Sequence, residues 1–317
     1  MALFQTLLKQ SGDIKDTRMA AQMYFKENGG ENMDKNPSYN LGFLQRKELF
    51  KESSSVTMEG PLCVDMCTTQ RYILCNTPVE ITLFRSRPEF VIQSHTEHQY
   101  KLCIQEIRLK ASFLDVHPGV IQGHSEALKA GANALYPFIR SDCRTFNIAQ
   151  GSRSFSFDNI FNSTYPQRII AAFVSSESFS GKWELNPFRL QHYDLSQIEL
   201  TVDGNSVPGR PLNCSFDDKG RNSVELFWRM YDVVGASNNP LFSNGLTPKD
   251  FNEGHSLMCF PLNGANMESS FLEVRRSANV GIQGTFSKAL TESVTLILYA
   301  EWASVIEIDA SRNVIIH

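Results

Sequence analysis

The chain has 317 residues, of which 42% are hydrophobic and 20% are charged. This length allows two domains of ordinary size, and this composition excludes a disordered chain and a coiled coil. The formal net charge of −4 excludes a generally basic surface that coats nucleic acid, although it leaves room for a local basic patch. The 22 phenylalanines favour β-sheet, because aromatic side chains suit half-buried pleated surfaces.

The N-terminal part is predicted to pass from helix to sheet. Residues 1–30 are expected to be largely helical, since Leu3, Leu7 and Leu8 recur at helical spacing. A polar loop over 29–42 and a partly helical stretch over 43–56 follow. Runs rich in β-branched and aromatic residues then predict strands within 61–67, 71–75, 79–86 and 100–116. About four strands amount to half a jelly roll, which cannot bury its apolar face alone.

Residues 118–143 are predicted to form a junction with a short helix. Ser125 precedes a run of helix formers, Gly131 follows it as a stop signal, and Pro118 and Pro137 bracket the segment. This junction separates a first unit, residues 1–117, from a second unit, residues 144–317.

The second unit is predicted to be one complete sandwich or jelly roll of about eight strands. Its strand signals lie in 144–161, 168–176, 195–209, 255–262, 279–286 and 293–309. Asp203 and Gly204 predict a tight turn, because glycine accepts a positive backbone angle cheaply. An insertion over 213–254 contains a predicted helix at 223–235, with Trp228 and Tyr231 on it.

No catalytic, cofactor-binding or metal-binding residue is predicted. The sequence has no H-E-x-x-H, no G-x-S-x-G and no glycine-rich phosphate loop. His95 and His98 flank Glu97 in a polar loop, but a zinc site needs further placed ligands, so we interpret them as surface residues.

The cysteines and the apolar segments indicate the compartment. The seven cysteines include no C-x-x-C pair, and most stand in apolar runs, so we expect free, buried thiols in a reducing compartment. No signal sequence and no apolar run of spanning length are present, which predicts a protein of the cytosol or nucleus without a membrane-spanning segment.

The second unit resembles a known family in the order and spacing of its motifs. The run from Tyr165 to Leu212 and the ending from Phe286 to Ile315 are similar to the major capsid proteins of Polinton/Maverick elements and adintovirus-like viruses. Pro166 and Arg168 are the first matching positions. The motif positions that follow them are Asn186, Pro187, Phe188, His192, Tyr193, Asp194, Asp203, Gly204, Pro208, Tyr299, Glu301, Glu307 and Asp309. Looser similarity continues upstream of residue 165.

This resemblance implies an all-β fold of two tandem jelly rolls, the first incomplete and the second complete, with short helices in the loops and at the junction. It implies a structural protein of the virion, assembled in the nucleus or cytoplasm. Homotrimers would form pseudo-hexagonal capsomers of an icosahedral shell, with neighbouring capsomers and penton or minor capsid proteins as partners. No cofactor and no specific nucleic-acid motif are implied. It also implies opening strands ahead of residue 1, so an N-terminally truncated gene or a decayed endogenous viral element is expected.

Two alternatives stay open. The insertion 213–254 forms a tower or an inter-subunit contact through Trp228 and Tyr231, or it folds back to cap its own sandwich. The whole chain is a capsid protein, or it is a host-domesticated β-sandwich that binds a ligand or a partner and forms no particle. An enzyme on a jelly roll is the third and least supported interpretation.

Overall fold

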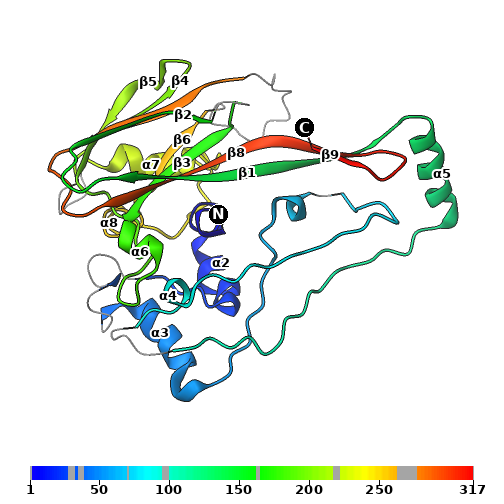
Figure 1. The fold of residues 1–317 in the computed structure, drawn as a ribbon, viewed down its shortest axis with the longest axis horizontal. Helices are drawn as coiled ribbons and strands as arrows, with labels where there is room; N and C mark the ends of the chain where they lie inside the picture. The colour runs from blue at the N-terminus through cyan, green and yellow to red at the C-terminus, as the bar shows by residue number, and fades with distance from the viewer. Residues whose placement is uncertain are drawn as a thin grey trace.

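The structure, a computed structural model, describes residues 2–27, 33–34, 39–69, 71–94, 100–161, 165–216, 222–262 and 277–316. Its C-terminal part is a sandwich of two antiparallel sheets (Figure 1). Sheet A has the strand order β1-β8-β3-β6, with β9 also paired to β8, and sheet B has the order β2-β7-β4-β5. The strands are β1 (Ala134–Ile148), β2 (Ser154–Phe161), β3 (Arg168–Ser175), β4 (Leu195–Val202), β5 (Asn205–Asn213), β6 (Met258–Pro261), β7 (Val280–Phe286), β8 (Val294–Ile308) and β9 (Val314–Ile316).

The strand pairing is that of a jelly roll. The first strand pairs with the eighth, the second with the seventh, the third with the sixth and the fourth with the fifth, all antiparallel. A rolled-up long hairpin gives this pairing, which places alternate pairs in opposite sheets. The predicted β-sandwich of antiparallel sheets is therefore confirmed, whereas the double jelly roll stays a prediction. The first strand of the sandwich begins at Ala134, ahead of residue 144, because β1 pairs with β8 all the way from Ile148 to Ala134.

The core lies between the two sheets and is rich in aromatic rings. Phe173 of β3 contacts Phe155 of β2 and Phe286 of β7, with ring centroids 5.6 and 5.8 Å apart. Trp302 of β8 contacts Phe161 of β2 at 5.2 Å. These contacts identify the face of sheet A that points into the core. Phenylalanine rings from both sheets fill this core.

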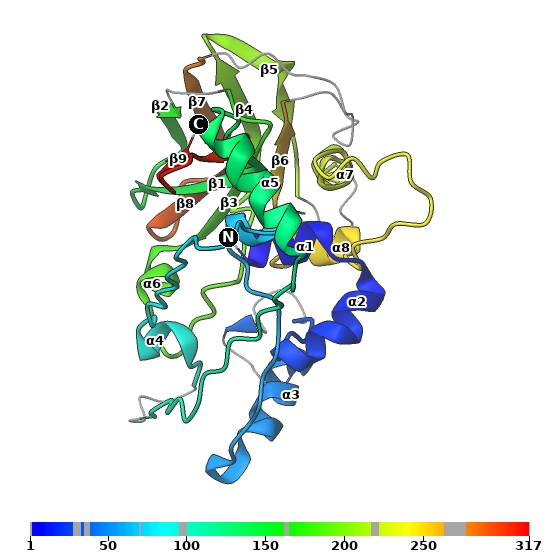
Figure 2. The same ribbon diagram turned by 90° about the vertical axis from the view of Figure 1, so that its right-hand side faces the viewer.

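A third, helical layer covers the outer face of sheet A (Figure 2). It consists of α1 (Ala2–Lys9) together with α7 (Val224–Asp232) and α8 (Pro248–Asn252) from the insertion. Phe4 of α1 stacks on Tyr299 of β8 at 5.5 Å, and Leu7 and Leu8 are buried in the main core. Because both of its faces are covered, all eight residues of β3 are buried. The same burial explains why β3 reads as an unbroken apolar run in the sequence.

β1 and β8 extend beyond the sandwich as a long ribbon, with α5 (Pro118–Lys129) at its far end (Figure 1). β9 joins the ribbon by pairing with Ile306–Ile308. Tyr136, Ile306 and Ile308 form a separate small core there, against which Met66 and Leu74 pack. The predicted junction helix is thus present, but it starts at Pro118, seven residues before Ser125. Pro118 can start it because the first helical position needs no amide hydrogen.

No β-strand occurs in the described part of residues 57–116, so the strands predicted within 61–67, 71–75, 79–86 and 100–116 were wrong for this structure. Apart from the short helices η5 (Asp65–Thr68) and α4 (Pro88–Val91), the described chain there has no regular secondary structure, and most of its apolar side chains are exposed. Strand-like patterning produces a sheet only when partners are present to accept the backbone hydrogen bonds. The expected burial of the cysteines fails for the same reason: Cys63, Cys67, Cys75 and Cys103 lie here and are exposed, as is Cys143, and only Cys214 and Cys259 are buried.

The remaining helices are short. They are α2 (Gly12–Asp16), η1 (Arg18–Gln22), α3 (Leu41–Leu49), η4 (Lys51–Ser53), η5 (Asp65–Thr68), α4 (Pro88–Val91) and α6 (Ser176–Ser180). The helical predictions for 1–30, 43–56 and 223–235 are confirmed where the chain is described. The predicted division into units at 117, 118–143 and 144 stays a prediction, although α1 contributes to the core of the C-terminal sandwich.

Candidate functional site

Arg168, Tyr299 and Glu301 meet on the outer face of sheet A, beneath α1. The Nε of Arg168 lies 2.5 Å from the Oε2 of Glu301, and the Tyr299 hydroxyl donates to Oε1 at 2.6 Å. Lys9 of α1 adds a second cation, with its Nζ 3.0 Å from Oε1. The Arg168 side chain is 10% exposed and that of Glu301 is 1% exposed, so this ion pair is shielded from solvent. The cluster fastens α1 to β3 and β8.

Electrostatics hold Glu301 in its charged form. Burial alone would raise the pKa of this carboxyl, but the Arg168 and Lys9 cations and the Tyr299 hydrogen bond outweigh burial, and the pKa falls below its ordinary value. The pKa of the Tyr299 phenol rises, mainly because of burial and then because of the adjacent Glu301 carboxylate. Both groups therefore keep one charge state at neutral pH, which suits a structural role.

Asn186 and its neighbours form a turn that binds Asp34. The N–H of Asn186 and the guanidinium of Arg189 both donate to the Asp34 carboxylate, and the Asn186 Oδ1 accepts from the N–H of Phe188 at 2.9 Å. Asn186 is buried, whereas Phe188 is partly exposed and meets the Phe90 ring edge-on at 5.7 Å. Pro187 lies between them and fixes the backbone of the turn.

His192, Tyr193 and Asp194 form the tight connection that leads into β4. Tyr193 and Asp194 have positive φ angles of 48° and 52°, and the His192 Nδ1 accepts from the N–H of Asp194 at 2.9 Å. The imidazole stacks on the Phe216 ring at 4.1 Å, and burial lowers its pKa despite Asp194 nearby. The Tyr193 hydroxyl donates to Glu292 at 2.8 Å. This segment closes the end of the sandwich.

Asp203 and Gly204 make the predicted tight turn between β4 and β5, with φ angles of +50° and +79°. The Asp203 carboxylate accepts from the N–H of Asn279 at 2.8 Å, which links the hairpin to the start of β7. Pro208 lies in β5, an edge strand, where a missing N–H breaks no ladder.

Glu307 and Asp309 lie at the outer end of the β1–β8 ribbon. The Glu307 carboxylate accepts from the Asn133 side chain. Asp309 accepts from both the backbone and the side chain of Asn313, at 2.9 and 2.8 Å, and so shapes the turn into β9. The motif positions therefore fall into five separate places and do not converge on one cavity; each holds a turn, a strand end or a buried ion pair.

Trp228 and Tyr231 lie on α7, whose other side packs on sheet A. Leu226 and Met230 are buried, while Trp228 is 53% exposed. Tyr231 is less accessible, since its hydroxyl donates to Asn244 Oδ1 at 3.1 Å and its ring meets Phe242. The insertion thus folds back on its own sandwich, and Trp228 is the residue of this pair that faces outward.

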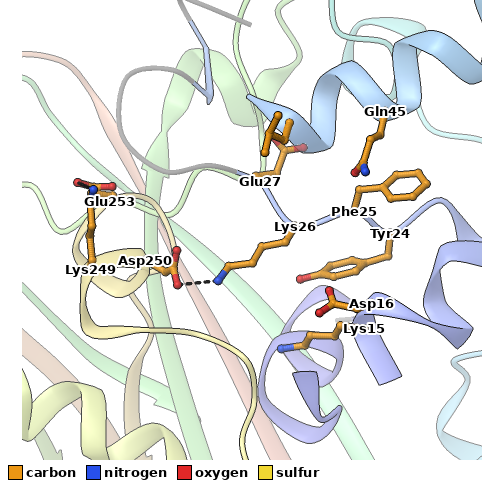
Figure 3. A pocket seen from close by; sticks show the side chains of 11 residues that line it. Lys15, Asp16, Tyr24, Phe25, Lys26, Glu27, Gln45, Lys249, Asp250 and Glu253 are labelled. Atoms are coloured by element: carbon orange, nitrogen blue, oxygen red, sulfur yellow. Dashed lines mark hydrogen bonds and ion pairs between the residues drawn. The ribbon is translucent and has the colours of Figure 1, made fainter. Parts of the chain in front are cut away.

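A cleft of about 690 Å³ separates the N-terminal segment from α8 (Figure 3). Lys26 spans it by an ion pair with Asp250 at 2.7 Å and a hydrogen bond to the Gly245 carbonyl. Lys15 is buried and donates to the carbonyls of Leu7 and Asn244, and burial lowers its pKa to about 8. Sequence reasoning missed these lysines, because nothing in the sequence predicts that residues 15 and 26 meet the insertion.

The described ranges contain no group of three or more His, Cys, Asp or Glu side chains that could hold a metal ion. None of the helices described is long and apolar enough to cross a membrane. His95, Glu97 and His98 lie outside the described residues.

Comparisons with known proteins give one distant sequence relative and several viral structures. No family model matches the chain. An uncharacterised protein of Caenorhabditis elegans is 24% identical over 319 residues, which cover 99% of this chain and 74% of that protein.

Among solved structures, the Sputnik virophage aligns with 58% of this chain and 39% of its own at 14% identity and a TM-score of 0.38. The mavirus major capsid protein aligns with 58% and 41% at 11% identity and a TM-score of 0.33, and the PBCV-1 capsid with 59% and 52% at 10% identity and a TM-score of 0.36. The aligned region spans about two-fifths to half of these viral chains.

Proposed function

We propose that this chain is a structural capsid protein that assembles with copies of itself. The eight-stranded jelly roll supports this proposal, and so does the ordered set of motif positions that resembles the capsid proteins of Polinton/Maverick elements and adintovirus-like viruses. In the finer form of the proposal, three copies make a pseudo-hexagonal capsomer of an icosahedral shell.

One observation carries the proposal: the exposed apolar surface of residues 79–116. Phe84 and Phe113 are each 92% exposed. The same stretch exposes the further large apolar side chains of Val79, Ile81, Leu83, Tyr100, Ile104, Ile107, Leu109, Leu114 and Val116. Large apolar side chains exposed this densely along one stretch indicate a surface that other polypeptide covers. A self-assembling shell protein provides that cover.

The segment 100–116 fits the same role, because it has no regular secondary structure and most of its apolar side chains are exposed. We propose that in the assembled protein this segment is covered by other copies of the chain. A double jelly roll is the finer form of the proposed fold. Trp228, exposed on α7, is proposed as a contact between subunits.

The test is the assembly state of the purified protein at micromolar concentration, by mass photometry and negative-stain microscopy. Threefold capsomers or closed shells are expected. A stable monomer that binds a small ligand would contradict the proposal and favour the domesticated binding module.

A matched pair of variants separates specific assembly from general stickiness. Phe84→Ser with Phe113→Ser removes two of the exposed rings, and we expect the trimer fraction to fall at least tenfold, as for two buried aromatic anchors. Leu241→Ser is the control, because Leu241 is 94% exposed and lies in the insertion, outside residues 79–116. Equal losses in both would contradict a specific role of 79–116.

A further inference from the structure

β1 is an edge strand of sheet A, so one row of its backbone groups faces away from β8. Three contacts identify this row. The N–H of Ser141 donates to Asp65 Oδ2 at 2.7 Å, the N–H of Cys143 donates to Asp142 Oδ1 at 2.8 Å, and the Leu135 carbonyl accepts from Arg71 at 2.6 Å. Since outward-facing residues alternate along a strand, the outward row consists of the odd-numbered residues.

Residues 65–69 and 71, which we call the edge mask, occupy part of this row. Asp65 holds both the N–H and the hydroxyl of Ser141, the latter at 2.6 Å. Met66 packs beside the small core of the ribbon and anchors the mask there. Beyond Cys143, no hydrogen bond joins the described residues of the mask to β1, and the side chains of Thr145 and Asn147 are exposed. Within the described ranges, the outward backbone groups of these two residues make no hydrogen bond.

The charges of β1 complement a second copy of the same strand. Antiparallel pairing of two β1 strands about a twofold axis at Cys143 places Asp142 opposite Arg144 of the other copy, twice. A register centred at Asp142 would instead oppose Arg140 to Arg144, which is repulsive. Asp142 and Arg144 now contact each other at 3.4 Å with side chains 44% and 45% exposed, so both can change partner.

The hydrogen-bonding row also favours this register. From Ile139 to Asn147 the outward residues all carry an N–H, whereas a register centred at Ser141 would oppose Pro137, which has none, to Thr145. Pairing about Cys143 sets Ser141 opposite Thr145 of the second copy. Asp65 already occupies the N–H of Ser141, so this pairing requires the mask to leave.

We propose that the edge of β1 from Ile139 to Asn147 is a pairing surface for β1 of a second copy, and that Asp65 masks it. The mask keeps free chains from pairing edge to edge, and its release opens a symmetric contact. This inference does not depend on the proposed capsid role, because it concerns the strand edge and its cover alone.

Cys143 is the natural reporter, because the proposed axis brings two copies of it face to face. The test uses a background in which the other exposed cysteines are removed: Cys63→Ser, Cys67→Ser, Cys75→Ser and Cys103→Ser. A short bismaleimide is added at pH 8 and dimers are counted on a denaturing gel. Asp65→Ala is expected to raise the dimer yield about tenfold, since it removes two charge-assisted hydrogen bonds from the mask. Asp115→Ala, at an exposed acid elsewhere, is expected to change nothing.

Two further variants make the result decisive. Thr145→Pro removes an outward N–H from the pairing row and is expected to abolish the added dimer in the Asp65→Ala protein. Cys143→Ser is expected to abolish all cross-linking through this edge. The proposal is overturned if Asp65→Ala gives no increase, or if the increase survives Thr145→Pro. Near-UV circular dichroism checks folding; if Asp65→Ala is unfolded, the nearly isosteric Asp65→Asn decides, with a several-fold increase expected.

Discussion

Glu301→Ala is expected to destabilise the protein by about 3–5 kcal/mol, because it leaves the buried Arg168 guanidinium without its counter-ion. Arg168 is 10% exposed and its remaining polar contact is the Val233 carbonyl at 2.8 Å, which carries no full charge. Lys9 is 37% exposed and can turn to solvent, so it contributes little to this loss. The free energy of unfolding is measured by urea titration followed by near-UV circular dichroism and by fluorescence.

The double variant Arg168→Met with Glu301→Leu tests the reasoning behind this magnitude. Replacing both buried charges removes the orphaned cation, so the double variant is expected to be more stable than Glu301→Ala. Glu59→Ala, which breaks an exposed ion pair with Lys110 at 2.6 Å, is the control and should leave stability unchanged. A Glu301→Ala loss below about 1 kcal/mol, or a double variant as unstable as the sum of the single ones, would refute the argument.

The acid dependence of the same cluster has a fixed sign. The folded pKa of Glu301 lies below the ordinary pKa of a glutamate, so its contribution to stability is complete above that ordinary pKa. This contribution is lost as pH falls through the lowered pKa, and the stability gap between wild type and Glu301→Gln is expected to close there.

Three further predictions follow from single residues. Burial lowers the pKa of His255 to about 4, so about 3 kcal/mol of stability is expected to be lost as pH falls from 6.5 to 4. His255→Gln is expected to reduce this loss, which is measured as the shift of the urea midpoint across this pH range. Leu7→Ala should cost about 2–5 kcal/mol in the same titration, because α1 belongs to the sandwich core. Gly204→Ala should cost about 1 kcal/mol or more, because its φ of +79° suits glycine although its surroundings are open.

Matched controls accompany these three changes. His124→Gln, on the exposed surface of α5, should leave the acid sensitivity intact. Leu241→Ala makes the same deletion as Leu7→Ala at a side chain that is 94% exposed, and should be near neutral. Gly123→Ala also has open space around it but lies within a helix, so it should stabilise the protein; a destabilisation there would contradict the backbone argument.

The local signals of the sequence were sufficient for the C-terminal sandwich. The dense apolar run over 293–309 became β8 (Val294–Ile308), and Asp203 with Gly204 became the expected turn. These features depend on neighbours in the chain or on alternation along one strand, which the sequence displays directly. The segment 57–116 shows the limit of the same reasoning, because its alternation describes a strand but cannot supply the strand's partner.

The candidate site was beyond prediction for a related reason. Arg168 and Glu301 were both noticed as motif positions, yet nothing in the sequence pairs them or adds Lys9 from the other end of the chain. The Asp34 carboxylate accepts a hydrogen bond from the N–H of Asn186, and no sequence pattern pointed to Asp34. The three leucines at 3, 7 and 8 indicated an apolar helix face but not that sheet A would cover it.

The central position of β8 has a consequence for how the chain is made. β8 lies between β1 and β3 and also packs against α1, so most of sheet A cannot form before β8 is present. Residues 2–9 and 134–148 precede β8 in the chain and are therefore synthesised well before their partner leaves the ribosome. Contacts this distant in sequence form slowly. The nascent chain thus carries an open, apolar half-sandwich until β8 has been synthesised, which makes it a candidate client for chaperones that hold unfinished β-sheets.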